Sequence, residues 1–204
     1  MNIQTEPILF LNTDNMQLVI FEGSDGAGKS SLIQNFLDKH PEVAQVALKT
    51  HWPKPDVNMP ALEYWKTQLT RGFEQIVHQP DIQYWIWDRS FLGNFIYGNY
   101  KKDQIALTYD ETIELLQLLN AMFDQVDWFL CRATRKELSA RLTVTGETYV
   151  TPAESHKLRK EYEQFFLQAP KFNKQRFIFL PFRKTVDQLT KIIFNLTKHE
   201  QPTH

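Results

Sequence analysis

The residues best suited to chemistry form a glycine-rich stretch near the start of the sequence. Residues 23–30 read Gly-Ser-Asp-Gly-Ala-Gly-Lys-Ser and match the phosphate-binding pattern G-x-x-x-x-G-K-[ST] without a mismatch. A short apolar run at 18–21 precedes them and a helical pattern at 29–40 follows, a context that a chance glycine turn would lack. Backbone N–H groups should then surround an anion at the positive end of a helix dipole. The expected phosphate site consists of Gly23, Ser24, Asp25, Gly26, Ala27, Gly28, Lys29, Ser30 and Ser31.

Two polar pairs supply the reactive groups. The Lys29 ammonium should reach the β- and γ-phosphates of ATP, and the Ser30 hydroxyl should bind Mg²⁺. Asp88 and Arg89 directly follow an aromatic and β-branched run at 82–87. Ligands of open α/β sheets bind beyond the carboxyl ends of the strands, so both pairs should meet at one edge. There Asp88 can hold Mg²⁺ and Arg89 can bind a second phosphate, whereas Asp88 and Arg89 taken alone would favour a helix cap with a surface ion pair.

A third candidate group lies on one face of a predicted helix at 60–78. Tyr64, Gln68 and Arg71 are spaced at i, i+4 and i+7. A ring for stacking, an amide for a base edge and a cation for a phosphate would together suit a nucleotide acceptor. A solvent-exposed helix face with one core aromatic explains the same spacing equally well.

Composition limits the function classes. The 204 residues fit one domain, 1–204, preceded by an N-terminal extension at 1–17 without an assigned role. A net charge of −1 argues against nucleic acid as a partner and leaves phosphate binding to a local site. The single cysteine excludes an intrachain disulfide. Because neither a membrane-length apolar run nor a signal pattern occurs, we expect a cytoplasmic protein without membrane contact.

The elements that must position these residues alternate along the chain. Hydrophobic patterns predict strands at 18–21, 46–50, 82–87, 128–131 and 176–180, and helices at 29–40, 60–78, 90–100, 110–123, 134–142, 152–168 and 185–198. Residues 143–151 form a polar break between two of these helices. Alternating strands and helices predict an α/β fold with a mostly parallel five-stranded sheet and helices on both faces.

Together these residues resemble the thymidylate kinase and deoxynucleoside kinase superfamily. The resemblance rests on the loop with its preceding Phe-Glu, on Asp88-Arg89 with Tyr97 beyond, and on Arg135 and Arg141 after the fourth strand. Residues 88–98 are similar to small bacteriophage kinases of this type. The resemblance implies a three-layer P-loop kinase fold with a short lid, ATP and Mg²⁺ as cofactors, and a homodimer that uses the helices at 90–100 and 110–123.

The resemblance also implies roles for matched positions. Asp25 would face the 3′-hydroxyl of the acceptor, Arg89 would hold an acceptor phosphate near Tyr97, and Asp88 would serve the metal. Arg135 and Arg141 would belong to a lid helix that closes over the transferring group. The expected catalytic set is Lys29, Asp88, Arg89, Arg135 and Arg141. With the three residues of the helix face at 60–78 included, the expected substrate set is Asp25, Tyr64, Gln68, Arg71, Arg89 and Tyr97.

The sequence departs from the family pattern in three places. Thr-His-Trp-Pro at 50–53 replaces the usual Arg-Glu-Pro-Gly of thymidylate kinases, Ser90 follows Asp88-Arg89 as in nucleoside kinases, and the lid segment 143–151 contains no arginine. These departures concern the identity of the acceptor more than the reaction.

The leading hypothesis is an ATP- and Mg²⁺-dependent kinase that acts on a deoxynucleoside monophosphate, thymidylate-like first. The alternatives are a kinase of the unphosphorylated deoxynucleoside and one of a modified base or another small hydroxyl. A GTPase-like switch is disfavoured because residues 173–176, Asn-Lys-Gln-Arg, lack the final Asp of the guanine-specific motif. A purely structural protein would leave Lys29 and Ser30 unexplained.

Overall fold

The computed structural model describes residues 17–40, 46–49, 59–77, 84–98, 100, 106–145 and 150–198. Almost all of the N-terminal extension, the segment 50–53 and the middle of the expected lid therefore lie outside the described residues. Within the described part of the chain, no helix combines the length and apolar character needed to cross a bilayer.

Strands and helices alternate along the described chain as the sequence predicts. The strands are β1 (Gln17–Glu22), β2 (Val46–Lys49), β3 (Tyr84–Asp88), β4 (Gln125–Leu130) and β5 (Gln175–Phe179). The helices are α1 (Lys29–Lys39), α2 (Ala61–Val77), α3 (Leu92–Gly98), α4 (Tyr109–Met122), α5 (Arg135–Thr145), α6 (Pro152–Gln168) and α7 (Val186–Lys198). The strands form one sheet in the order β2-β3-β1-β4-β5, and all neighbouring strands are parallel. The predicted α/β class with a parallel sheet is confirmed.

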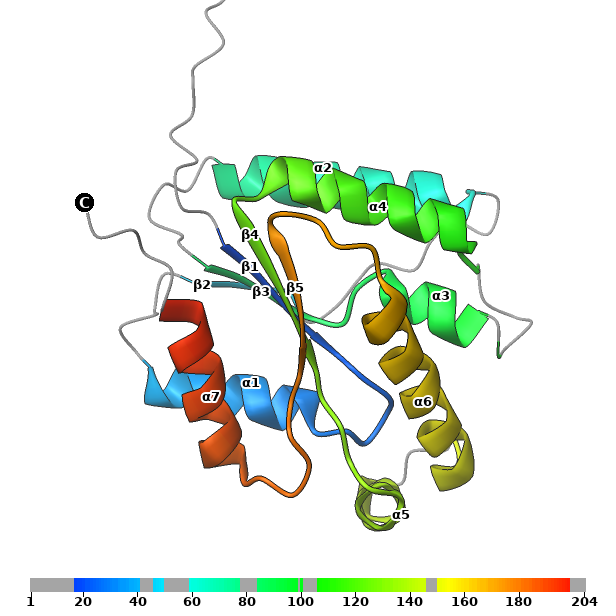
Figure 1. Ribbon diagram of the computed structural model, residues 1–204, viewed down its shortest axis with the longest axis vertical. Helices are drawn as coiled ribbons and strands as arrows, with labels where there is room; N and C mark the ends of the chain where they lie inside the picture. The colour runs from blue at the N-terminus through cyan, green and yellow to red at the C-terminus, as the bar shows by residue number, and fades with distance from the viewer. Residues whose placement is uncertain are drawn as a thin grey trace, which may run out of the picture.

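Helices cover both faces of this sheet. Figure 1 shows α1 and α7 on one face and α2, α3, α4 and α6 on the other, with α5 beyond the sheet next to α6. The alternation of side chains along β1 explains the two layers: Leu18 and Ile20 join the core beneath α2, α3, α4 and α6, whereas Val19 and Phe21 join the core beneath α1 and α7. The central strand β1 is thus buried on both sides, as is usual in a parallel sheet covered by helices.

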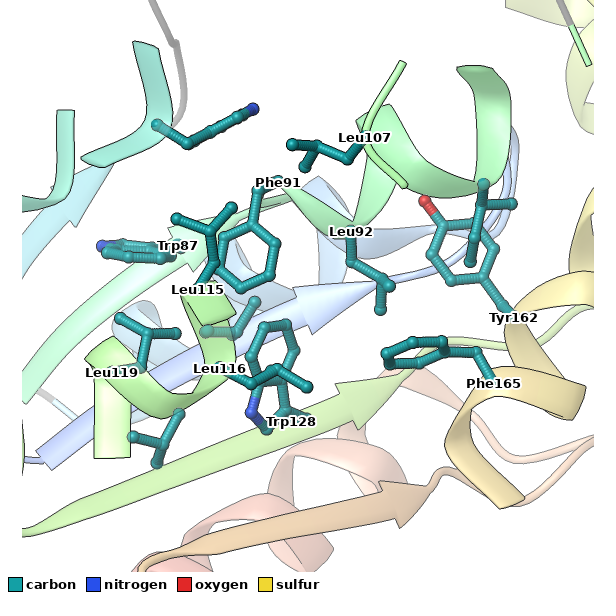
Figure 2. Close-up of a cluster of buried hydrophobic side chains, with 14 of the residues drawn as sticks. Trp87, Phe91, Leu92, Leu107, Leu115, Leu116, Leu119, Trp128, Tyr162 and Phe165 are labelled. Carbon is teal, nitrogen blue, oxygen red and sulfur yellow. The ribbon is translucent and has the colours of Figure 1, made fainter. Parts of the chain in front are cut away.

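The larger core is rich in aromatic side chains and holds the chain just after β3. Phe91 lies edge-on to Trp128 of β4, with ring centroids 5.8 Å apart, and to Trp65 of α2 at 6.0 Å. Figure 2 shows Phe91 between Trp87 and Leu92, with side chains of α4 packed around it. Because Phe91 follows Asp88-Arg89-Ser90, this packing anchors the turn that carries the second polar pair.

Threonine caps start four helices and are absent from a fifth. α4, α5, α6 and α7 begin after Thr108, Thr134, Thr151 and Thr185, whose hydroxyls accept a backbone N–H three residues later. The acidic or amide side chain at that third position bonds back to the threonine N–H. α1 instead follows Gly28, which offers no side-chain cap. Its first N–H groups therefore remain available to an anion.

Two predicted boundaries were wrong by three residues. β4 begins at Gln125 instead of 128, because Asp127 is paired within the sheet with Arg176 of β5. α5 continues to Thr145 instead of ending at 142, so the helix includes the start of the expected polar break. The Thr143 hydroxyl there donates to the Ser139 carbonyl at 2.8 Å, a bond that a helix accommodates.

Candidate active site

The phosphate loop closes tightly because glycine occupies its left-handed positions. Gly23 has φ 138° and Gly28 has φ 90°. A Cβ at position 23 would lie 2.4 Å from the Cys131 carbonyl oxygen, and one at 28 would lie 3.0 Å from the Arg141 Nη1 atom. Neither position can accept a larger side chain without moving its neighbours. The loop therefore presents backbone N–H groups ahead of α1.

Lys29 is buried at the centre of the loop. Lys29 is only 4% exposed, and its Nζ donates hydrogen bonds to the carbonyl oxygens of Gly23 at 2.8 Å and Ser24 at 3.0 Å. Burial, followed by the nearby Arg89 charge, lowers the Lys29 pKa to about 8. An anionic phosphate would offset both effects, so this cation is suited to a negatively charged ligand.

Ser30 and Asp88 meet across the sheet edge as the sequence predicts. The Ser30 hydroxyl donates to Asp88 Oδ2 at 2.6 Å. Parallel pairing of β1 with β3 sets Phe21 opposite Asp88, which brings the ends of both strands together. A hydroxyl and a carboxylate at this spacing are oxygen ligands of the kind that Mg²⁺ prefers.

Asp25, Arg89 and Tyr97 form a second polar cluster beside the loop. Arg89 pairs through its Nη2 with Asp25 Oδ1 and lies 5.9 Å from the centroid of the Tyr97 ring. The Tyr97 hydroxyl donates to Asp25 Oδ2 at 3.1 Å. Arg89 has φ 74°, a left-handed conformation that is uncommon for a residue with a side chain. Two side chains that come 64 and 72 residues later in the chain thus converge on Asp25.

A cavity of ≈ 680 Å³ extends from the loop toward α7. Six cationic side chains and three anionic ones line it: Lys29, Arg89, Arg132, Arg141, Arg183 and Lys184 against Asp25, Asp88 and Glu137. This excess of positive charge occurs in a protein whose net charge is −1. The cavity is therefore a local anion site of a size suited to a small molecule.

The two predicted lid arginines occupy different places on α5. Arg141 lines the cavity and donates to the Gly26 carbonyl at 3.1 Å, so it contacts the loop directly. Arg135 is exposed in the first turn of α5 and does not line the cavity.

The predicted face of α2 is not brought to this cavity. Tyr64 is 5% exposed within the larger core, where its ring lies edge-on to Trp65 at 5.3 Å. Gln68 is half-buried and Arg71 is exposed. None of the three lines the cavity. Their role in acceptor binding stays a prediction.

Several site residues were missed. Arg132, Arg183 and Lys184 line the cavity from the ends of β4 and β5, the edge where the topology places ligands, so their position was a usable signal. Ser155 of α6 is fully buried, and its hydroxyl donates to the Asp25 carbonyl at 2.6 Å. Glu22 is fully buried at the end of β1. The positions of Ser155 and Glu22 relative to the loop depend on tertiary packing that no local pattern reveals.

Comparison with known proteins gives structural neighbours alone. The sequence matches no family model and no curated protein. Among solved structures, the YorR protein from Bacillus subtilis in complex with phosphorylated GDP has a TM-score of 0.61 at 18% identity, covering 92% of this chain and 99% of that one. Polyphosphate kinase 2 from Arthrobacter aurescens has a TM-score of 0.60 at 13% identity, covering 92% of this chain and 69% of that one. Deoxyadenosine kinase from M. mycoides with dCMP and dCDP has a TM-score of 0.51 at 19% identity, covering 89% and 98%.

The chain has a P-loop kinase fold. The structural similarity establishes the fold. At identities this low, the activity has to be inferred from the residues of the site.

Proposed function

We propose that this protein is a kinase that transfers a phosphoryl group from ATP, with Mg²⁺, to a deoxynucleoside monophosphate. The observation that carries the proposal is that the cationic cavity meets a polar cluster at Asp25 and Arg89. On one side lie the phosphate loop and the cationic cavity, and on the other lies the Asp25, Arg89 and Tyr97 cluster. The kinases among the structural neighbours support the same reaction class.

Each residue has a defined task in this reaction. The loop N–H groups and Lys29 would hold the β- and γ-phosphates, and Arg141 would approach them from α5. Ser30 and Asp88 would hold Mg²⁺, which neutralises charge on the phosphates. Phosphoryl transfer depends mainly on positioning and charge stabilisation, so no further reactive group is required.

The acceptor would bind on the α3 and α6 side of the loop. Asp25 would accept a hydrogen bond from a deoxyribose hydroxyl, and Arg89 would contact the acceptor phosphate. Tyr97, which already donates to Asp25, would fix the carboxylate for this task. Arg135, Tyr64, Gln68 and Arg71 remain candidates for contacts made when the lid closes and the acceptor is bound.

One observation favours a second candidate, a kinase of the unphosphorylated deoxynucleoside. Arg89 already has a counter-charge, because Asp25 pairs with its guanidinium. A monophosphate is therefore not needed to compensate a buried cation. Ser90, which follows Arg89, is the residue that nucleoside kinases commonly have there.

A coupled ADP-release assay across the four deoxynucleosides and their monophosphates tests the proposal. Turnover with one or more monophosphates, dependent on Mg²⁺ and abolished in Lys29→Ala, is the expected result. Turnover with nucleosides alone would replace the leading candidate with the second. ADP release without any acceptor dependence would contradict both.

Four further predictions accompany this function. We propose that residues 1–204 act as a single catalytic domain in the cytoplasm, with no nucleic acid among its partners. We propose a homodimer through α3 and α4, which the elution volume in size-exclusion chromatography with light scattering would check.

A further inference from the structure

Glu22 is a buried carboxylate that the proposed reaction does not use. It ends β1, is 0% exposed, and follows Leu18 and Ile20 on the alternate positions that face α3 and α6. Its Oε1 accepts two hydrogen bonds from Ser90, from the backbone N–H at 2.8 Å and from the hydroxyl at 2.6 Å. Its Oε2 has no hydrogen-bond partner among the described residues. A buried carboxylate without a bonded cation is costly, so folding alone gives little reason for it.

The two bonds from Ser90 hold the turn that carries Arg89. The Arg89 N–H donates to the Phe21 carbonyl at 3.0 Å, so β1 binds this turn at two successive residues. Between these two attachments Arg89 takes its left-handed conformation, which the surrounding contacts must maintain. That conformation directs the guanidinium to Asp25 and the Gly23 carbonyl.

We propose that Glu22 is a positioning residue that holds the Asp88-Arg89-Ser90 turn, and through it the Arg89 guanidinium, in place for the acceptor. This inference rests on the proposed function, since it assigns Glu22 to the acceptor half of the kinase site. This role requires a side-chain oxygen at position 22 that can accept both hydrogen bonds from Ser90. Glutamine retains that oxygen and alanine does not.

Two substitutions and one control separate this role from general destabilisation. Glu22→Gln should keep kcat/KM for the acceptor within about threefold of the parent, and Glu22→Ala should lower it by about tenfold or more at saturating ATP, with KM for ATP little changed. Asp127→Asn changes another fully buried carboxylate, near the start of β4 and far along the strand from the loop. This control should lower thermal stability and leave both kcat/KM for the acceptor and KM for ATP unchanged.

Two kinetic results would overturn the proposal. If Glu22→Gln were as damaging as Glu22→Ala, the charge and not the bonds to Ser90 would matter. If Glu22→Ala altered the acceptor and ATP constants equally, the role would be general support of the loop. Should Glu22→Ala fail to fold, Ser90→Ala removes one of the two bonds from the other side. It should lower the acceptor kcat/KM by about threefold, and a parent-like value would count against the proposal.

Amide hydrogen exchange tests the same inference without any activity. The Ser90 N–H should exchange about tenfold faster in Glu22→Ala than in the parent, and at the parental rate in Asp127→Asn. Unchanged Ser90 exchange in Glu22→Ala would show that Glu22 does not hold the turn. If the parent phosphorylates no nucleoside or monophosphate, the kinase proposal fails while this measurement still decides whether Glu22 holds the turn.

Discussion

The sheet buries charge in opposite ways at the two ends of its parallel strands, which we term the amino edge, where the strands begin, and the carboxyl edge, where they end. At the amino edge, the Asp127 carboxylate accepts hydrogen bonds from Arg176 Nε at 2.6 Å and Nη2 at 2.7 Å. It also accepts from the side-chain amides of Gln17 at 2.5 Å and Gln125 at 2.9 Å. At the carboxyl edge, burial raises the pKa of Glu22 and leaves one of its oxygens without a partner among the described residues.

The contrast extends from the side chains to the backbone. The carboxyl edge also contains Arg89 in a left-handed conformation and Lys29 with a lowered pKa. Incomplete pairing and strain are costly to stability, and they gather where a ligand can compensate for them. The amino edge should therefore govern stability and the carboxyl edge activity.

Lys29→Ala should produce the largest effect, and it should fall on activity alone. Removing the cation that contacts the phosphates should lower kcat by about 10³-fold, the upper range for loss of one preorganised charge contact. The urea midpoint should stay the same or rise, because a desolvated amine is removed. Steady-state kinetics and urea denaturation check both halves. Retention of more than about a tenth of the activity, a difference under roughly 1.4 kcal/mol, would contradict the assignment.

Asp127→Ala should show the reverse pattern. Breaking a buried pair by removing one partner costs about 3–5 kcal/mol, because Arg176 is left without its carboxylate. Arg176 also donates to the Leu196 carbonyl of α7 at 3.1 Å, so that helix should loosen with it. Urea denaturation measures the loss, and kcat at a temperature well below the melting point should remain parental. A kinetic defect of the size seen in Lys29→Ala would break the division between the two edges.

How much the sequence could predict depends on how local the deciding contacts are, and it does not follow the division between the two edges. The loop and its lysine were predictable because contiguous residues determine their geometry. Asp88 was predictable because chain order places strand ends at one edge. The start of β4 was not predictable, because an aspartate is unfavourable in a buried strand unless a cation pairs with it, and that cation, Arg176, lies far along the chain. Glu22 directly precedes the phosphate loop, yet its bond to Ser90 joins residues 68 apart, which local patterns cannot foresee.

Asp88→Asn should separate metal use from nucleotide binding at the carboxyl edge. The amide keeps one oxygen and can still accept the Ser30 hydroxyl, but it loses the charge that attracts Mg²⁺. We expect the Mg²⁺ concentration for half-maximal turnover to rise and kcat to fall by about 10–100-fold, while ATP binding without metal is little affected. Titration of Mg²⁺ against turnover measures this. Superimposable curves for mutant and parent would remove Asp88 from the metal site.

Arg89→Ala should decide between the two acceptor classes. If Arg89 contacts an acceptor phosphate, kcat/KM for a monophosphate should fall by about tenfold or more, in line with a charged hydrogen bond worth about 1.5–3 kcal/mol. Activity with the corresponding nucleoside should change much less, since its partner contact is absent. The mutant-to-parent ratio of kcat/KM is measured in parallel for the nucleoside and the monophosphate of the same base. Equal losses on nucleoside and monophosphate would favour the second candidate, in which Arg89 chiefly orients Asp25.

Ser155→Ala should give the smallest effect and the finest test of the division. Ser155 lies on α6 but bonds to the Asp25 carbonyl of the loop. Thr197, also a buried hydroxyl, bonds within its own helix, and its partners among the described residues are the carbonyls of Ile193 and Phe194. Ser155→Ala and Thr197→Val should each cost about 1 kcal/mol of stability, the net value of one hydrogen bond.

The kinetics of these two variants should differ although their stabilities do not. Freeing the Asp25 carbonyl in Ser155→Ala should loosen the carboxylate that faces the acceptor. The acceptor kcat/KM should therefore fall by about threefold, or roughly 0.6 kcal/mol, while Thr197→Val stays parental. Urea denaturation and acceptor kinetics on both proteins make the comparison. Parental kinetics in Ser155→Ala would show that Asp25 is held without α6, and equal kinetic losses in both variants would mean that stability alone sets activity.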